Sequence, residues 1–129
     1  MKRTVLLIED NEQNRYLATF LLEAHGYAVV PACDGAVGIE LAGSILPQLI
    51  LLDIQLPTMD GYAVARKLRS NPALKEVPIV AVTSYAMVGD REKAIAAGCN
   101  GYIEKPINPE TFVPDIERYL GEAPKENHP

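Results

Sequence analysis

The sequence predicts an α/β protein, a doubly wound five-stranded parallel sheet with five helices. Five short apolar runs alternate with longer amphipathic segments, which is the pattern of strands joined by helical crossovers. The runs at residues 49–52 and 79–82 show no polar alternation, so we expect both to be covered on two faces. Because such crossovers are right-handed, the common strand order 2-1-3-4-5 is expected.

The first strand is expected at residues 5–8, and the helix after it has a cap at each end. Asn11 can cap its start and Gly26 its end. Four apolar residues at i, i+3, i+4 and i+7 form the stripe that this helix should bury: Leu17, Phe20, Leu21 and Ala24. A second strand at 28–30 then precedes a helix over 34–44.

The middle of the chain repeats this alternation twice. A third strand at 49–52 is followed by a helix over 62–70, which Asn71-Pro72 ends. A fourth strand at 79–82 is followed by a helix over about 88–97. The pattern therefore continues without a linker or an internal repeat.

The last unit is a short strand at 102–103 and a helix that follows Asn108-Pro109, a cap-plus-proline start. Pro114 is awkward in that helix, because proline breaks a helix interior. Either the helix begins near Thr111, which puts Pro114 in its first turn, or it is kinked.

Length and charge limit what the chain can be. Its 129 residues fit one domain, and a net charge of −5 argues against nucleic acid or an anionic membrane as the main partner. No apolar run approaches the roughly 20 residues needed to cross a bilayer. Two cysteines, Cys33 and Cys99, are too few for a disulfide framework, and we expect both to be reduced and buried in a cytoplasmic protein.

Polar residues follow four of the five predicted strands. Glu9 and Asp10 follow the first, Asp53 the third, Thr83 the fourth and Lys105 the fifth. The carboxyl ends of parallel strands meet at one edge of the sheet, so these side chains should converge there. Crowded carboxylates favour a bound cation, and hard oxygen ligands suit Mg²⁺. With a lysine and a threonine beside it, such a site could stabilise a phosphoryl group passing to a carboxylate.

Each of these residues also has an ordinary structural explanation. Glu9-Asp10 could be a pair favoured by a helix dipole, and Asp53 could cap a turn. Thr83 could simply end a strand, and Lys105 could be a solvated loop lysine. Their joint placement at the ends of strands one, three, four and five favours a functional site.

The sequence resembles the response-regulator receiver family, of the CheY-like superfamily, over almost its full length, about residues 5 to 120. The matching segments are Val5-Leu6-Leu7-Ile8-Glu9-Asp10-Asn11, Leu51-Leu52-Asp53-Ile54-Gln55-Leu56-Pro57, Met59-Asp60-Gly61, Ala81-Val82-Thr83, Ala97-Gly98 and Tyr102-Ile103-Glu104-Lys105-Pro106. Within the family, the sequence is most similar to stand-alone DivK-type regulators and to the receivers of hybrid kinases. The resemblance implies a flavodoxin-like receiver domain over 1–120 and a short polar tail over 121–129.

The resemblance also implies a role for each site residue. Asp53 would be the phosphoacceptor and Asp10 a direct Mg²⁺ ligand, with Glu9 as the second acidic position. Gln55 would offer its backbone carbonyl to the metal. Thr83 and Lys105 would contact the phosphoryl group.

The family further implies a switch and two kinds of partner. Thr83 would move toward the phosphoryl group and Tyr102 would turn into the space it leaves. This repacks the face made by helix four, strand five and helix five, which would bind a downstream protein.

The phosphoryl donor would be a sensor histidine kinase or a phosphotransfer protein. Lys105-Pro106 would be the family's cis peptide. On this interpretation the protein is not an enzyme but a phosphoacceptor switch, which catalyses only its own phosphorylation and dephosphorylation.

Three other functions remain open at this point. A haloacid-dehalogenase-type phosphatase would need an aspartate two residues after its nucleophile, where this chain has Gln55. A flavodoxin-like cofactor binder would need a loop rich in serine, threonine and glycine after strand one, where this chain has Glu9-Asp10. A degenerate receiver used only for docking would not need every site position filled.

Overall fold

A computed structural model of the chain contains five parallel β-strands in one sheet. The structure describes residues 2–57, 59–84 and 88–120. The strands are β1 (Thr4–Ile8), β2 (Ala28–Ala32), β3 (Leu49–Asp53), β4 (Ile79–Thr83) and β5 (Gly101–Glu104). Their order in the sheet is β2-β1-β3-β4-β5, which confirms the predicted topology.

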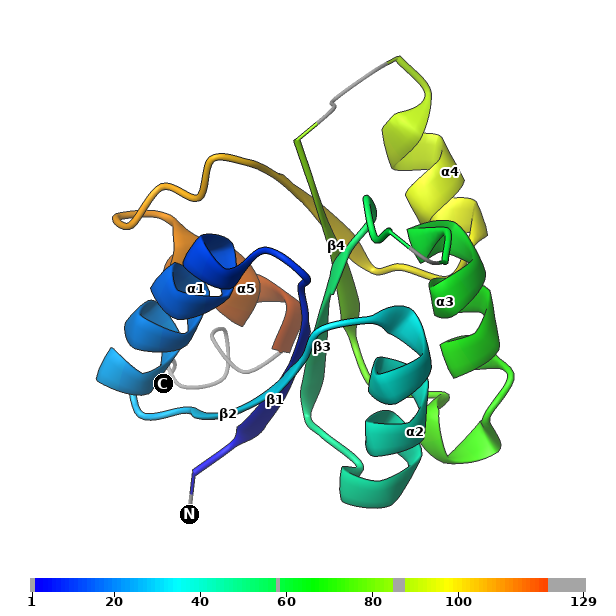
Figure 1. The fold of residues 1–129 in the computed structure, drawn as a ribbon, viewed down its shortest axis with the longest axis horizontal. Coiled ribbons are helices and arrows are strands. Elements are labelled where there is room, and N and C mark those ends of the chain that lie inside the picture. Colours follow the sequence, from blue (N-terminus) through cyan, green and yellow to red (C-terminus); the bar gives the residue numbers. More distant parts are fainter. Residues whose placement is uncertain (1, 58, 85–87, 121–129) are drawn as a thin grey trace, which may run out of the picture.

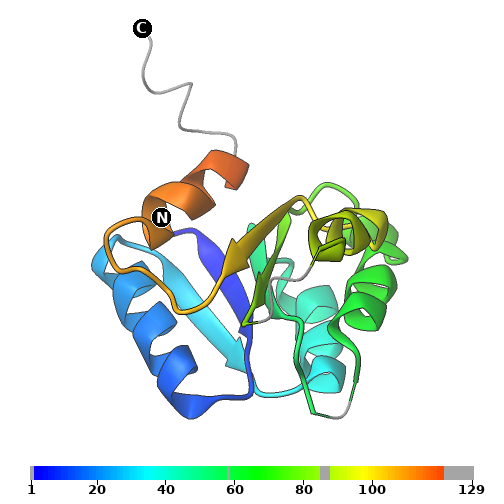
Figure 2. The same cartoon turned by 90° about the horizontal axis from the view of Figure 1, so that it is seen from above.

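Helices cover both faces of this sheet. They are α1 (Glu12–Ala24), α2 (Gly35–Ile45), α3 (Gly61–Arg69), α4 (Asp90–Ala96) and α5 (Phe112–Leu120). Figures 1 and 2 show α1 and α5 on one face and α2, α3 and α4 on the other. The five predicted helices are therefore present in the described residues, in the arrangement of a doubly wound fold.

The core has two layers, one on each side of the sheet. Alternate residues of a strand point to opposite faces, so Leu6 and Ile8 pack on one side and Val5 and Leu7 on the other. Every residue of β3 is buried. This explains why the predicted central strands carry no polar alternation, because both of their faces are covered by helices.

Among the described residues, three α-helices begin at a capping side chain. Asn11 accepts a hydrogen bond from the backbone N–H of Asn14, and Asp34 accepts one from Val37, both at 2.9 Å. Asp60 accepts one from Tyr62 at 3.2 Å. The cap predicted at Asn11 is confirmed, and Asp34, predicted as the first residue of the second helix, is its cap.

The buried stripe of α1 differs from the predicted one. Leu17 and Leu21 face the sheet as expected, but Phe20 is 59% exposed and Ala24 is also exposed. Ala18 and Leu22 take their places in the core. The helical period was predicted correctly, but the buried side of α1 is shifted by about one residue from the predicted side. The neighbouring sheet and α5 decide which side of the helix packs.

The later helices show three differences from the prediction. Helix α4 begins at Asp90, two residues after the predicted start. A short 3₁₀ helix over Pro72–Leu74, labelled η1, was not predicted. Helix α5 begins at Phe112, so Pro114 lies in its first turn, which is the first of the two predicted alternatives.

The two cysteines have different environments. Cys99 is buried as expected, whereas Cys33 is exposed, so that prediction was wrong. Cys33 follows the end of β2, an edge strand whose residues are mostly only partly buried. Both thiols are free. In the part of the chain that the structure describes, no helix has both the length and the hydrophobicity of a membrane span.

Candidate functional site

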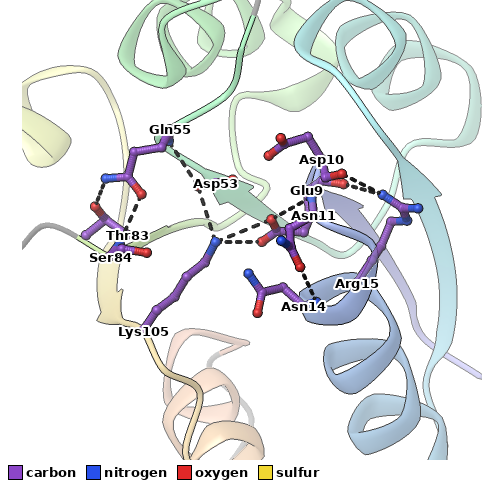
Figure 3. Close-up of polar contacts among 10 residues, drawn as sticks. All are labelled: Glu9, Asp10, Asn11, Asn14, Arg15, Asp53, Gln55, Thr83, Ser84 and Lys105. Atoms are coloured by element: carbon purple, nitrogen blue, oxygen red, sulfur yellow. Dashed lines mark hydrogen bonds and ion pairs between the residues drawn. The ribbon is translucent and has the colours of Figure 1, made fainter.

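The polar residues that follow the strands converge at one edge of the sheet (Figure 3). Glu9 and Asp10 follow β1, Asp53 ends β3, Thr83 ends β4 and Lys105 follows β5. The register brings these ends level, since strands β1, β3, β4 and β5 pair in parallel. The sequence-predicted set is therefore brought together by the fold.

Three carboxylates form the centre of the site. Glu9, Asp10 and Asp53 each place an oxygen within 4.8 Å of the others. Glu9 and Asp53 are both only 3% exposed, whereas Asp10 lies at the solvent-exposed side of the cluster. The negative charges of the two buried acids are therefore poorly screened by water, whereas the third acid remains accessible to solvent.

Burial makes this charge costly. The pKa of Asp53 is raised, first by desolvation and further by the nearby Glu9, while the Gln55 backbone N–H and Lys105 act in the opposite direction. Burial also raises the pKa of Asp10, and the neighbouring Asp53 adds to the effect. The cluster therefore favours whatever cation or proton can neutralise it.

Lys105 supplies one such cation from inside the protein. Its Nζ lies 3.0 Å from Glu9 Oε1 and 3.6 Å from Asp53 Oδ1, and its side chain is only 9% exposed. The ordinary alternative of a solvated loop lysine is therefore excluded. The ammonium is closer to Glu9 than to Asp53 and lies between the two acids. The Lys105-Pro106 peptide is cis, as the resemblance implied.

The backbone of the acidic loop is held in part by Arg15, which the sequence did not predict as a site residue. Arg15 Nη1 donates to the carbonyl oxygens of Glu9 at 2.9 Å and Asp10 at 3.2 Å. The backbone N–H of Asn11 donates to Glu9 Oε2 at 3.2 Å. Nothing in the sequence distinguishes Arg15 from an ordinary surface arginine of an amphipathic helix.

A glycine allows the loop after Asp53 to pack closely. A Cβ at Gly61 would lie 2.5 Å from the Cα of Ile54 and 2.9 Å from the carbonyl oxygen of Asp53. Real side chains do not approach a backbone so closely, so only glycine fits here. The Asp60-Gly61 pair in the sequence thus has two local roles, a cap for α3 and close approach to the residue after Asp53.

Gln55 connects the end of β3 to the end of β4. Its backbone N–H donates to Asp53 Oδ1 at 2.9 Å. Its side-chain Nε2 donates to Thr83 Oγ1, and its Oε1 accepts from the backbone N–H of Ser84 at 3.0 Å. Figure 3 shows the Gln55 side chain reaching across to Thr83 and Ser84. The resemblance implied a role for the backbone carbonyl of Gln55 only, so this role of its side chain was not predicted.

Tyr102 lies on β5, partly buried against the core on the α3 and α4 side of the sheet. Its hydroxyl oxygen is buried and has no hydrogen-bond partner among residues 2–57, 59–84 and 88–120. Burial raises the pKa of Tyr102, with Asp90 adding to the effect. A buried hydroxyl without a partner costs free energy, because water can no longer bond to it.

The donor set fits a magnesium ion. Mg²⁺ binds hard oxygen ligands, typically one or two carboxylates, and retains several waters. The cluster of Glu9, Asp10 and Asp53 offers such oxygens on one side and solvent on the other. The costly negative charge at Asp53 and Asp10 is the kind that a bound divalent cation relieves.

The family model for the response regulator receiver domain matches residues 5–117 of the chain. The chain belongs to this family. A curated relative, the polar-differentiation response regulator DivK of Brucella anthropi, is 42% identical over 123 residues, which cover 95% of this chain and 100% of the relative. This receiver chain therefore aligns with the whole of a response regulator.

Solved receiver structures have the same fold. The chemotaxis protein CheY4 of Vibrio cholerae matches with a TM-score of 0.88 at 27% identity, covering 92% of this chain and 99% of CheY4. The receiver domain of sensor histidine kinase PA1611 from Pseudomonas aeruginosa matches with a TM-score of 0.86 at 34% identity, covering 94% and 99%. That PA1611 structure has a magnesium ion coordinated in its active-site cleft.

One prediction concerns the stability of the receiver without a metal. We expect Asp53→Asn to raise the free energy of unfolding by about 1–2 kcal/mol at neutral pH in EDTA, because it removes a buried charge that the folded state disfavours. The folded-state pKa of Asp53 lies above its ordinary value of 3.8. The penalty is therefore complete above that raised pKa, shrinks as the pH falls through it, and vanishes below 3.8.

Urea unfolding at a series of pH values measures this difference. Asp34→Asn is the matched control, since asparagine caps a helix as well as aspartate does and its effect should be small. An Asp53→Asn variant less stable than the wild type at neutral pH would contradict the electrostatic argument.

Proposed function

We propose that this receiver takes a phosphoryl group onto Asp53 from a phosphohistidine, and that the phosphorylated protein signals by binding other proteins. The observation that carries the proposal is the convergence of Glu9, Asp10, Asp53 and Lys105 at one edge of the sheet. Membership of the receiver family supports Asp53 as the phosphoacceptor, since the region matched by the family model contains all four residues.

In this proposal each site residue has one task. Asp53 is the nucleophile: one of its carboxylate oxygens forms a bond to phosphorus as the P–N bond of the donor breaks, and the electron pair leaves on the imidazole nitrogen. Lys105 provides positive charge beside the incoming phosphoryl oxygens. Thr83, at the end of β4, provides a hydroxyl that can donate to one of these oxygens.

Asp10 and Asp53 would hold Mg²⁺ directly, with Glu9 as the second acidic position and the Gln55 backbone carbonyl as a further oxygen. The ion would supply positive charge that offsets the three carboxylates and the phosphoryl oxygens. The PA1611 receiver, with magnesium in its cleft, supports this choice of metal.

Output would pass through the face formed by α4, β5 and α5. Tyr102 lies on this face, and its buried hydroxyl has no partner among the described residues, which supports a second arrangement in which the ring turns into the space that Thr83 leaves. Ile95 on α4 is half-exposed, which suits a protein partner. Thr83 and Tyr102 would together form the switch that reshapes the face.

The finer parts of this proposal follow from the same chemistry. The phosphoryl donor would be a sensor histidine kinase or a phosphotransfer protein, and the location would be the cytoplasm. The protein would act as a switch that catalyses only its own phosphorylation and dephosphorylation. Residues 1–120 would form the receiver domain. The tail expected at 121–129 lies outside the described residues.

Labelling with a small phosphodonor tests the proposal. We expect acetyl phosphate with Mg²⁺ to add one phosphoryl group to the wild type, seen by intact mass, and none to Asp53→Asn, which lacks the nucleophile. EDTA should prevent labelling of the wild type. The control Asp34→Asn should be labelled normally, since that side chain caps α2. Equal labelling of wild type and Asp53→Asn would overturn the assignment of the phosphoacceptor.

A further inference from the structure

We propose that the Gln55 side chain is a clamp that holds the end of β4 in its resting arrangement and must release for the receiver to switch. This inference rests on the proposed function, because it concerns how a phosphoryl group on Asp53 is sensed. In this role the Gln55 side chain is a positioning group, whereas the Gln55 backbone carbonyl is the group that would face the metal.

The geometry of the clamp is a two-point attachment. One amide group donates through Nε2 to Thr83 Oγ1 and accepts through Oε1 from the Ser84 backbone N–H at 3.0 Å. The second bond settles the orientation of the amide, because a backbone N–H can only bond to its oxygen. Both partners lie at the end of β4, so one side chain ties two consecutive residues to the loop after β3.

The same residue also contacts the phosphoacceptor. The Gln55 backbone N–H donates to Asp53 Oδ1 at 2.9 Å. Hydrogen bonds to an ionised carboxylate are stronger than neutral ones. Forming an acyl phosphate removes that carboxylate charge, and so weakens the bond that anchors Gln55 next to Asp53.

These contacts make the clamp oppose the movement of Thr83. In the resting structure the Thr83 oxygen is directed to the Gln55 amide (Figure 3). Movement of Thr83 toward a phosphoryl group on Asp53 stretches or breaks the bonds at Thr83 and Ser84. A variant without the amide should therefore populate the switched arrangement more readily, and a ligand that selects this arrangement should bind it more tightly.

Beryllofluoride, which mimics a phosphoryl group on a carboxylate, is the probe. We expect Gln55→Met, which has a similar length and no amide, to lower the midpoint of a beryllofluoride titration in Mg²⁺ by about fivefold, the effect of about one hydrogen bond. The Ser84 amide should also exchange its hydrogen faster in the free protein. Gln55→Asn is one methylene too short to span both partners and should shift the midpoint in the same direction.

Gln48→Met is the matched control. The Gln48 side chain also accepts from a backbone N–H, that of Thr4 at 2.6 Å, but it lies where β1 begins, at the opposite edge of the sheet. Its substitution should leave the midpoint unchanged. A merely structural role of Gln55 would weaken beryllofluoride binding, whereas the clamp predicts tighter binding.

The outcomes separate the two proposals. A wild type that does not respond to beryllofluoride overturns the proposed function itself. A wild type that responds, together with Gln55 variants whose midpoint is unchanged or raised, overturns the clamp and leaves the function standing.

Discussion

Replacing Lys105 with methionine is expected to slow labelling of Asp53 by acetyl phosphate by about a hundredfold or more. The ammonium lies 3.6 Å from Asp53 Oδ1 and 3.0 Å from Glu9 Oε1, and its side chain is 9% exposed. Positive charge in a site that water reaches poorly stabilises developing negative charge far more than it does in water. Methionine keeps the length of the stem and removes the charge.

Two further substitutions make the result specific. Lys67→Met, on the exposed side of α3, makes the same chemical change away from the site and should leave labelling unchanged. Lys105→Arg keeps the charge but replaces a compact ammonium with a planar fork, so it should recover only part of the rate. Initial rates by intact mass at saturating Mg²⁺ provide the measurement. A Lys105→Met rate within about threefold of the wild type would show that the ammonium does not assist the transfer.

The largest expected effect on stability is that of Arg69→Met, a loss of about 2–4 kcal/mol in the free energy of unfolding. The Arg69 guanidinium, at the end of α3, bonds to two separate segments, one between α3 and β4 and one between α4 and β5. Its bonds of 2.6–2.9 Å reach the carbonyl oxygens of Gly98, Leu74 and Val77 and the side chain of Asn100. Partial burial lowers the pKa of Arg69, because it withdraws some of the charge from water.

Methionine would remove the Arg69 donor from the partly buried carbonyl oxygens of Gly98 and Val77, whereas the Leu74 carbonyl oxygen would keep its bond from the Val77 N–H at 3.2 Å. The Asn100 side-chain oxygen would also lose its bond from Arg69. This oxygen accepts from the backbone N–H of Ile79 at 2.9 Å as well, so it helps to position the start of β4. Urea unfolding measures the loss, with Arg66→Met on the exposed side of the same helix as control, expected to change stability by less than about 0.5 kcal/mol. A similar small change for Arg69→Met would mean that water replaces the arginine at no cost.

The elements of the fold were predictable because their signals are local. Apolar runs and helical periods identify strands and helices from neighbouring residues, and the caps at Asn11 and Asp34 act on N–H groups three residues away. The strand order followed from the rule that parallel crossovers are right-handed. The rotation of α1, which exposes Phe20, was not predictable, because a 3.6-residue period does not say which neighbour the helix will meet.

The members of the site were predictable for a related reason. In a parallel sheet the carboxyl ends of the strands share one edge, so residues just after each strand must come close together. This places Glu9, Asp10, Asp53, Thr83 and Lys105 in one group before any coordinate is known. Arg15 gave no such signal, because it lies on a helix among other exposed polar residues.

By itself the sequence determined which elements form, in which order they lie in the sheet, and which polar residues meet at its edge. Only the tertiary structure decided how those residues pair: that Lys105 lies nearer Glu9 than Asp53, that Gln55 reaches Thr83 and Ser84, and that Arg69 joins α3 to two later segments. The physical reason is the separation along the chain over which each interaction acts. Backbone periodicity and crossover handedness depend on nearby residues, whereas side-chain direction and ion pairing depend on the packing of segments far apart in the chain.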